Sequence, residues 1–202
     1  TDIIYSSVTF KTSNNVENLN LTGSGDIDAT GNSLDNILRG NNGVNILRGG
    51  SGNDTLYGNA GNDYLHGGSG IDTMIGGEGN DTYDVDNTSD TVTESFSQGT
   101  DTIYSSVTFT TPSDVEDLNL TGSGDIDATG NSLDNHLRGN SGANTLSGGE
   151  GNDILEASGG NDVVNGENGD DTLRGGSGED TLNGGEGIDN LRGGSGNDTL
   201  KG

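Results

Sequence analysis

The chain has 202 residues, 39 of them glycine and none cysteine, with 33 acidic against 7 basic side chains and a formal net charge of −26. The lack of cysteine excludes disulfides and thiolate metal sites, and the acidic excess argues against nucleic acid or an anionic membrane as a partner. About a fifth of the residues are Leu, Ile, Val or Phe, a composition near that of disordered chains, so we expect folding to require a neutralising partner such as a divalent cation.

Residues 1–30 predict a β-rich entry segment. Apolar side chains alternate from Ile4 to Phe10, and Leu19 and Leu21 alternate in the same way, which is typical of strands. Residues 26–31, and their copy at 125–130, resemble the front of an EF-hand loop. The acidic twelfth ligand is missing, because Ile37 and His136 occupy that place, and we therefore interpret both segments as solvated turns.

Residues 31–84 and 130–202 repeat a frame of nine residues. Six residues of the form Gly-Gly-x-Gly-x-Asp predict a turn, since glycine adopts the backbone angles that tight turns need. The remaining three, x-apolar-x, predict a very short strand. The eighth position is apolar in all fourteen repeats, so these side chains would point inward and stack into a thin core. The eighth positions are Leu38, Leu47, Leu56, Leu65, Met74, Tyr83, Leu137, Leu146, Leu155, Val164, Leu173, Leu182, Leu191 and Leu200.

Residues 85–129 form a connector that repeats the entry segment. Residues 1–56 align without gaps on 100–155, and 43 of those 56 positions are identical. Alternating apolar residues predict strands at 103–109 and at Leu118 and Leu120. We expect an irregular section of one continuous solenoid, with a small β cap between two separate rolls as the alternative. Asp84, Asp86, Asp90 and Glu94 would suit an extra ion, although a polar strand edge is the simpler interpretation.

The sixth position of the frame predicts a calcium site. Calcium prefers six to eight oxygen ligands and accepts backbone carbonyls as readily as carboxylates. In a flattened roll, consecutive turns fall on opposite edges, so turns eighteen residues apart are neighbours. An aspartate at the sixth place of both neighbours would then bring two carboxylates to each ion.

This frame, over residues 31–84 and 130–202, closely resembles the repeats-in-toxin (RTX) family, also called hemolysin-type calcium-binding repeats. The resemblance implies an all-β fold, a right-handed parallel β-roll (β-solenoid) with nonapeptide GGxGxDxUx turns. In that family an ion lies between turns n and n+2. It takes the carbonyls of positions two and four and the aspartate of the first turn, and the carbonyls of positions one and three and the aspartate of the second.

Carried onto this chain, the resemblance implies about six full Ca²⁺ sites. In the first block the ligands would be Gly50, Gly52, Asp54, Gly67, Ser69 and Asp72 on one edge, and Asn59, Gly61, Asp63, Gly76, Glu78 and Asp81 on the other. In the second block they would be Gly149, Gly151, Asp153, Ser158, Gly160, Asp162, Gly166, Glu167, Asn168, Gly169, Asp171, Gly175, Gly176, Ser177, Gly178, Asp180, Gly184, Glu186, Asp189, Gly193, Ser195 and Asp198.

Four turns depart from the pattern at the sixth place. Asn36, Asn45, Asn135 and Asn144 stand where aspartate is expected. These turns would complete only weakened half-sites with the next aspartates, which would raise the number of ions to about ten. We expect them to be structural rather than occupied.

The predicted function is a calcium-binding module without an active site of its own. His66 and His136, the two histidines, lack the spacing of a zinc site, and no catalytic constellation stands out. As the resemblance implies, such segments leave the cell unfolded through type I secretion machinery and fold in extracellular calcium, which stabilises a covalently attached cargo. The alternatives are the C-terminal tail of a secreted enzyme, such as a lipase, metalloprotease or alginate-modifying enzyme, and the repeat array of an adhesin or surface-layer protein.

Two features concern what surrounds the segment. No apolar run approaches transmembrane length, and no charged-then-apolar leader opens the chain. Leu200 to Gly202 begin another turn, so we expect the chain to be a segment of a longer secreted or cell-surface protein.

Overall fold

The computed structural model describes residues 1–95 and 98–202 and contains two compact units, Thr1–Thr102 and Ile103–Gly202. Within the described residues the regular structure consists of short strands, with no helix. The strand pairs of the described residues are parallel, and the prediction of an all-β parallel roll is confirmed. Residues 96 and 97, which belong to the predicted connector, lie outside the described residues.

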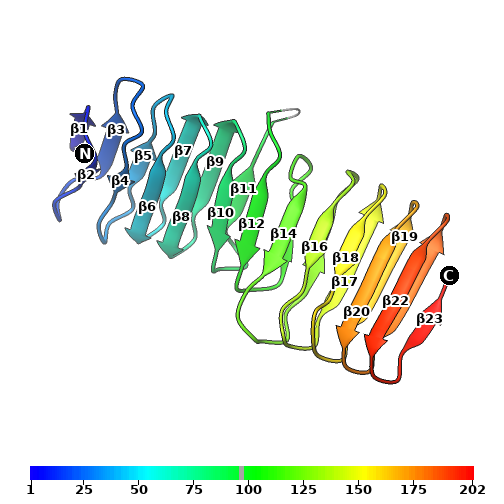
Figure 1. Ribbon diagram of the computed structural model, residues 1–202. Coiled ribbons are helices and arrows are strands. Elements are labelled where there is room, and N and C mark those ends of the chain that lie inside the picture. Colours follow the sequence, from blue (N-terminus) through cyan, green and yellow to red (C-terminus); the bar gives the residue numbers. More distant parts are fainter. Residues whose placement is uncertain (96–97) are drawn as a thin grey trace. The chain divides into compact units, whose positions relative to one another are not determined.

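The first unit is built from two parallel sheets whose strands alternate along the chain (Figure 1). One sheet has the order β1 (Ile3–Ser6), β3 (Asn18–Leu21), β5 (Ile37–Arg39), β7 (Thr55–Ala60), β9 (Thr73–Glu78) and β11 (Thr91–Thr93). The other contains β2 (Phe10–Lys11), β4 (Ala29–Thr30), β6 (Ile46–Ser51), β8 (Tyr64–Ser69) and β10 (Thr82–Val85). Each pair of nonapeptides therefore makes one full coil of the roll.

The second unit repeats this arrangement. One sheet contains β12 (Thr102–Ser105), β14 (Asp117–Leu120), β16 (His136–Arg138), β18 (Ile154–Glu156), β20 (Thr172–Ser177) and β22 (Asn190–Ser195). The other contains β13 (Phe109–Thr110), β15 (Ala128–Thr129), β17 (Thr145–Glu150), β19 (Val163–Asn168), β21 (Thr181–Glu186) and β23 (Thr199–Lys201). In both units the irregular segment before the nonapeptides pairs with them in parallel, through Leu19 opposite Leu38 and Leu118 opposite Leu137.

The register between regular strands is eighteen residues, which stacks eighth positions on eighth positions. Leu47 lies opposite Leu65, and Leu146 lies opposite Val164. Of the fourteen residues predicted to point inward, the first twelve, from Leu38 to Leu182, are fully buried, at 0% exposure. Leu191 is half-buried and Leu200 is 47% exposed, because they lie in the last two repeats, where no later strand of the chain covers them.

The predicted strand at 103–109 is divided in the structure. β12 ends at Ser105 and β13 begins at Phe109, in the facing sheet. The cause is a side-chain turn: the buried Ser105 hydroxyl donates to the Val107 carbonyl at 2.7 Å, and the Val107 amide is 3.2 Å from the same hydroxyl oxygen. Ser6 and Val8 divide the corresponding segment of the first unit in the same way. Residue alternation alone does not reveal this reversal, because both strands keep apolar residues facing inward.

Candidate calcium sites

The sixth-position aspartates line the edges of the two rolls and are buried. Each follows a glycine-rich turn and directly precedes a strand, so its short side chain is directed into the space between stacked turns. Eight of them are only 1–2% exposed: Asp54, Asp63, Asp72, Asp81, Asp153, Asp162, Asp171 and Asp180. Asp189 and Asp198, in the last two turns, are half-buried.

A ladder of hydrogen bonds joins each predicted aspartate pair through one carboxylate oxygen. The Asp54 amide donates to Asp72 Oδ1 at 2.7 Å, and the Asp63 amide donates to Asp81 Oδ1 at 2.7 Å. The four pairs of the second unit have the same bond, at 2.8–3.1 Å. The structure therefore brings together all six pairs that the eighteen-residue spacing predicts.

The second carboxylate oxygen has no partner. The Oδ2 atoms of all eight buried aspartates are inaccessible to water and accept no hydrogen bond in the described residues. An unpaired charged oxygen away from water is strongly unfavourable. Each such oxygen is therefore suited to binding a cation.

In the turns that begin with glycine, this first residue lies against two of the proposed ligand oxygens. A Cβ atom on Gly49 would collide with Asp54 Oδ2 and would lie 2.6 Å from the Gly67 carbonyl oxygen. A Cβ atom on Gly175 would likewise collide with Asp180 Oδ2 and lie 2.6 Å from the Gly193 carbonyl oxygen. A carboxylate oxygen of turn n and the position-one carbonyl of turn n+2 thus face the same small space, as the predicted ligand set requires.

Positions two and four direct further carbonyls toward the neighbouring turn. Gly50 and Gly52 have φ angles of 121° and 110°, in the region that glycine favours. Their carbonyl oxygens face Gly68 and Gly70 of the turn eighteen residues later. Position two is not always glycine: Asn59, Ser158 and Glu167 adopt φ of 81°, 81° and 78°. The backbone conformation at the site is therefore kept even where the residue type changes.

Burial also perturbs the carboxylates electrostatically. Loss of hydration, partly offset by the backbone amide bonds, raises the pKa of Asp54, Asp81 and Asp153 to about 7. It raises the pKa of Asp63, Asp72 and Asp162 to about 6. The atoms that would bind the ion are all carboxylate and carbonyl oxygens, which are the ligands that calcium prefers. The residues present therefore fit this ion.

Comparison with known proteins agrees with this geometry. The family model of the RTX calcium-binding nonapeptide repeat, which spans four copies, matches residues 30–65, 57–92, 129–164, 147–182, 156–191 and 183–202. Together these matches cover more than half of the chain. The chain belongs to the RTX calcium-binding nonapeptide repeat family. A search of curated proteins finds no match.

The asparagine turns of this RTX chain use side-chain amides where the aspartate turns have an unpartnered oxygen. Asn45 Oδ1 accepts the Asn41 amide at 2.8 Å, and its Nδ2 donates to the Ile27 carbonyl at 2.7 Å. Asn36, Asn135 and Asn144 make the corresponding bonds. In each turn the amide nitrogen binds a carbonyl that precedes it by eighteen to twenty residues. Weak ion binding at these four half-sites stays a prediction, and the hydrogen bonds favour the structural interpretation.

The nonapeptide frame extends one turn further than the sequence analysis placed it. Asp90 occupies the sixth place of a turn beginning at Val85, and Val92, at the eighth place, is 4% exposed. The Asp72 amide donates to Asp90 Oδ1 at 2.9 Å, and Asp90 Oδ2 accepts the Asn87 amide at 3.1 Å. Because both of its oxygens are bonded, Asp90 resembles an asparagine turn. The signal that would have found it was the persistence of the nine-residue spacing without the glycines.

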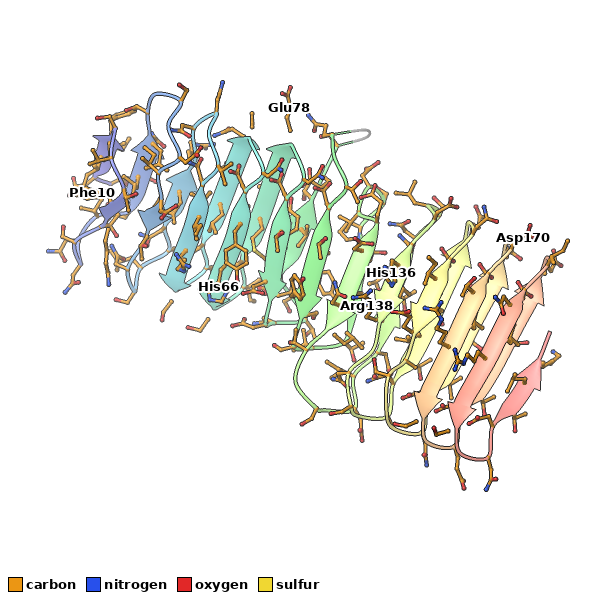
Figure 2. The ribbon with its side chains drawn as sticks, in the orientation of Figure 1. Phe10, His66, Glu78, His136, Arg138 and Asp170 are labelled. Carbon is orange, nitrogen blue, oxygen red and sulfur yellow. The ribbon has the colours of Figure 1, made fainter. Side chains whose placement is uncertain are left out.

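The remaining acidic and histidine candidates take ordinary structural positions. Asp84 accepts a hydrogen bond from the Tyr64 hydroxyl and lies 3.2 Å from His66 Nδ1. Glu94 lies with Asp81 and Asp101 instead, so the four acidic residues of 84–94 do not form one site. His136 Nε2 lies 3.4 Å from a Glu156 oxygen. Figure 2 shows His66 and His136 on strands, Glu78 at the end of β9 and Asp170 in a turn, and both acidic side chains are exposed.

The interpretation of the two EF-hand-like segments as solvated turns is wrong for their second halves, because these form β4 and β15 and bury Ala29 and Ala128. Asp26 Oδ1 accepts the Val44 amide at 2.9 Å, and Asp28 Oδ1 accepts the Ile46 amide at 3.0 Å. Asp125 and Asp127 make the same bonds in the second unit. These carboxylates hold the backbone eighteen residues later.

Proposed function

We propose that this chain is a calcium-dependent folding module of a secreted protein. In low calcium the chain is disordered, and in extracellular calcium it forms the β-roll and stabilises a covalently attached cargo. Passage of the unfolded chain through type I secretion machinery belongs to the same proposal, on the basis of RTX family membership. The observation that carries the proposal is the set of eight buried carboxylate oxygens without a hydrogen-bond partner.

Charge balance supports a requirement for cations in folding. The chain has a formal net charge of −26, and the rolls bury aspartates at neighbouring positions on the same edge. Without a cation, repulsion and lost hydration oppose burial of these groups. An ion shared by two turns reverses both effects, so binding and folding become one event.

The proposed ion count is about six, one for each aspartate pair that the amide ladder joins. Every pair combines two carboxylates with carbonyls of the turns, and calcium accepts this number and kind of ligand. Magnesium demands a tighter octahedral arrangement at shorter distances and retains its water. We therefore expect calcium to fold the chain and magnesium to fail.

The test is a calcium titration followed by far-ultraviolet circular dichroism, with magnesium as the control. The proposal expects little β signal in chelator and a cooperative gain with calcium alone. The folding midpoint should lie at roughly 10⁻⁴–10⁻³ M, the range of extracellular calcium modules, so that the chain stays unfolded before export. A β-rich spectrum in chelator would contradict the proposal, as would a midpoint at the far lower calcium level of the cytosol.

Among the residues that the structure describes, none lies in a helix that could cross a membrane.

A further inference from the structure

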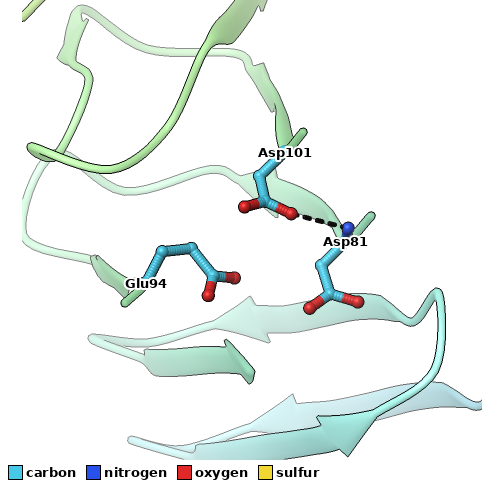
Figure 3. Close-up of side chains that lie close together, drawn as sticks. All are labelled: Asp81, Glu94 and Asp101. Carbon is cyan, nitrogen blue, oxygen red and sulfur yellow. Dashed lines mark hydrogen bonds between the residues drawn. The ribbon is translucent and has the colours of Figure 1, made fainter. Parts of the chain in front are cut away.

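The regular pattern is interrupted on one edge of the first unit, directly after Asp81. The irregular turn stacked next to it, residues 98–101, stands outside the nonapeptide frame. The Asp81 amide donates to Asp101 Oδ1 at 2.8 Å (Figure 3), and the Thr102 amide donates to the Asp81 carbonyl at 2.9 Å. Asp101 therefore takes the place of a sixth-position aspartate, although it lies twenty residues after Asp81 instead of eighteen.

Glu94 takes the place of the missing carbonyl ligand. In regular turns the space beside the first glycine is faced by an aspartate Oδ2 atom and by the position-one carbonyl of turn n+2. A Cβ atom on Gly76 would instead collide with Asp81 Oδ2, Glu94 Oε1 and the Tyr83 hydroxyl. The Gly77 amide donates to Glu94 Oε2 at 3.3 Å, and the Tyr83 hydroxyl donates to Oε1. Glu94 thus supplies a third carboxylate at the position of a backbone oxygen.

The three carboxylates are buried together. Asp81, Glu94 and Asp101 are 1%, 8% and 2% exposed, respectively, and one oxygen of each lies within 4.8 Å of the others. Asp81 Oδ2 is also one of the buried oxygens without a hydrogen-bond partner. Loss of hydration, followed by the Asp101 charge, raises the pKa of Glu94 to about 8. Three such groups in one buried space repel one another strongly unless a cation lies between them.

We propose that Asp81, Glu94 and Asp101 bind a further calcium ion, in addition to the six sites of the nonapeptide pairs. The ligand set contains three carboxylates, one more than a nonapeptide pair provides, and the Gly79 carbonyl faces Gly99 of the irregular turn as in a regular pair. Asp81 would be shared with the Asp63 site, as Asp171 is shared in the second unit. This inference rests on the proposed calcium-dependent fold.

The test counts calcium ions on the folded chain by native mass spectrometry. Glu94→Gln removes one carboxylate while keeping the size of the side chain, and we expect it to bind one ion fewer than wild type. Glu179→Gln is the matched control, because Glu179 is exposed on a turn and belongs to no proposed site, and we expect it to bind the wild-type number. An unchanged count in Glu94→Gln would overturn the inference and make Glu94 a protonated partner of Tyr83.

Terbium luminescence provides a readout that does not depend on the stability of the Glu94 variant. Tyr83 touches the proposed ligand Glu94, so excitation of tyrosine should sensitise terbium bound there. We expect Tyr83→Phe to lose part of the tyrosine-sensitised emission while it keeps its full calcium count, because Tyr64, next to Asp63, still sensitises the neighbouring site. Retention of the full emission in Tyr83→Phe would place terbium elsewhere and contradict the site.

The two proposals fail differently. Wild-type chain that binds no calcium would overturn the proposed function, and this site with it. Wild-type chain that binds calcium and folds, combined with a Glu94→Gln count equal to that of wild type, would overturn this site alone.

Discussion

Asp171 is the most informative residue to change, because it lies between two neighbours on one edge of the second roll. Its Oδ1 accepts the Asp153 amide at 2.8 Å, and its own amide donates to Asp189 Oδ1 at 3.0 Å. It would therefore bind two ions, one on each side. Asp189, in contrast, pairs only with Asp171 in this chain. The substitutions Asp171→Asn and Asp189→Asn are chemically identical and differ in the number of sites they touch.

The expected losses follow from this arrangement. Asparagine keeps an Oδ1 acceptor for the amide ladder and removes the charge of the unpartnered oxygen. We expect Asp171→Asn to lose two bound ions and Asp189→Asn to lose one. A site held at 100 times its dissociation constant contributes about 2.7 kcal/mol. At that calcium level Asp171→Asn should therefore destabilise the roll by about 5 kcal/mol, and Asp189→Asn by about half as much.

Native mass spectrometry would count the ions, and urea unfolding at fixed free calcium would measure the free energy of unfolding. Asp170→Asn is the control, since Asp170 is exposed and its Oδ1 only accepts the Ile188 amide at 2.8 Å. We expect it to change neither quantity appreciably. In chelator the order should reverse, because Asp171→Asn removes a buried charge and should be at least as β-rich as wild type. Equal ion losses for Asp171→Asn and Asp189→Asn would refute the shared-ligand arrangement.

Three further predictions test the sites from other directions. Gly178→Ala should abolish one ion without removing a ligand, because its Cβ would collide with the carbonyl oxygen of Gly160, a proposed ligand; an unchanged calcium count would contradict this. Asn45→Ala should destabilise the roll by about 1–3 kcal/mol, since it leaves buried backbone groups without partners. The number of bound ions should not change. Urea unfolding would measure the loss of stability, and calcium-binding calorimetry would count the ions. The pKa of Asp54 is raised by burial to about 7 in the fold, above its unfolded value. Protonation therefore stabilises the calcium-free roll, and this stability is lost as the pH rises through about 7. Circular dichroism in chelator should show more β signal at about pH 5 than at about pH 8, and the calcium midpoint should rise as the pH falls.

Most of the regular fold could be predicted from spacing alone. A leucine such as Leu56 at every eighth position specifies which side chains are buried, and an aspartate such as Asp54 at every sixth position specifies the ladder. Both follow from one period, because a solenoid places equivalent residues in equivalent surroundings. The six aspartate pairs follow from the same period, because consecutive turns alternate between the two edges and turns on one edge are therefore eighteen residues apart.

The irregular elements could not be predicted in this way, because each depends on a local contact that breaks the period. The hydroxyl of Ser105 ends a strand where residue alternation continues. The two-residue insertion before Asp101 moves this aspartate out of the frame, and only the three-dimensional stacking brings it to Asp81. Glu94 was predicted as part of a different acidic group, since its position along the chain does not reveal that it replaces a backbone carbonyl.

The contrast between aspartate and asparagine turns indicates where the fold depends on calcium. An aspartate turn such as that of Asp63 buries an oxygen without a hydrogen-bond partner, whereas the Asn45 side-chain amide in the preceding turn on the same edge donates to a backbone carbonyl. The backbone amide of Asn45 also donates to Asp63 Oδ1 at 2.8 Å, so the two kinds of turn are directly joined. On each edge of a roll, an asparagine turn therefore precedes the first aspartate turn and donates a backbone amide to one oxygen of its aspartate. In a solenoid each repeat is stabilised by its neighbours. Under the proposed calcium-driven folding, this contact would therefore be the place where folding begins, and it would propagate toward the turns with higher residue numbers.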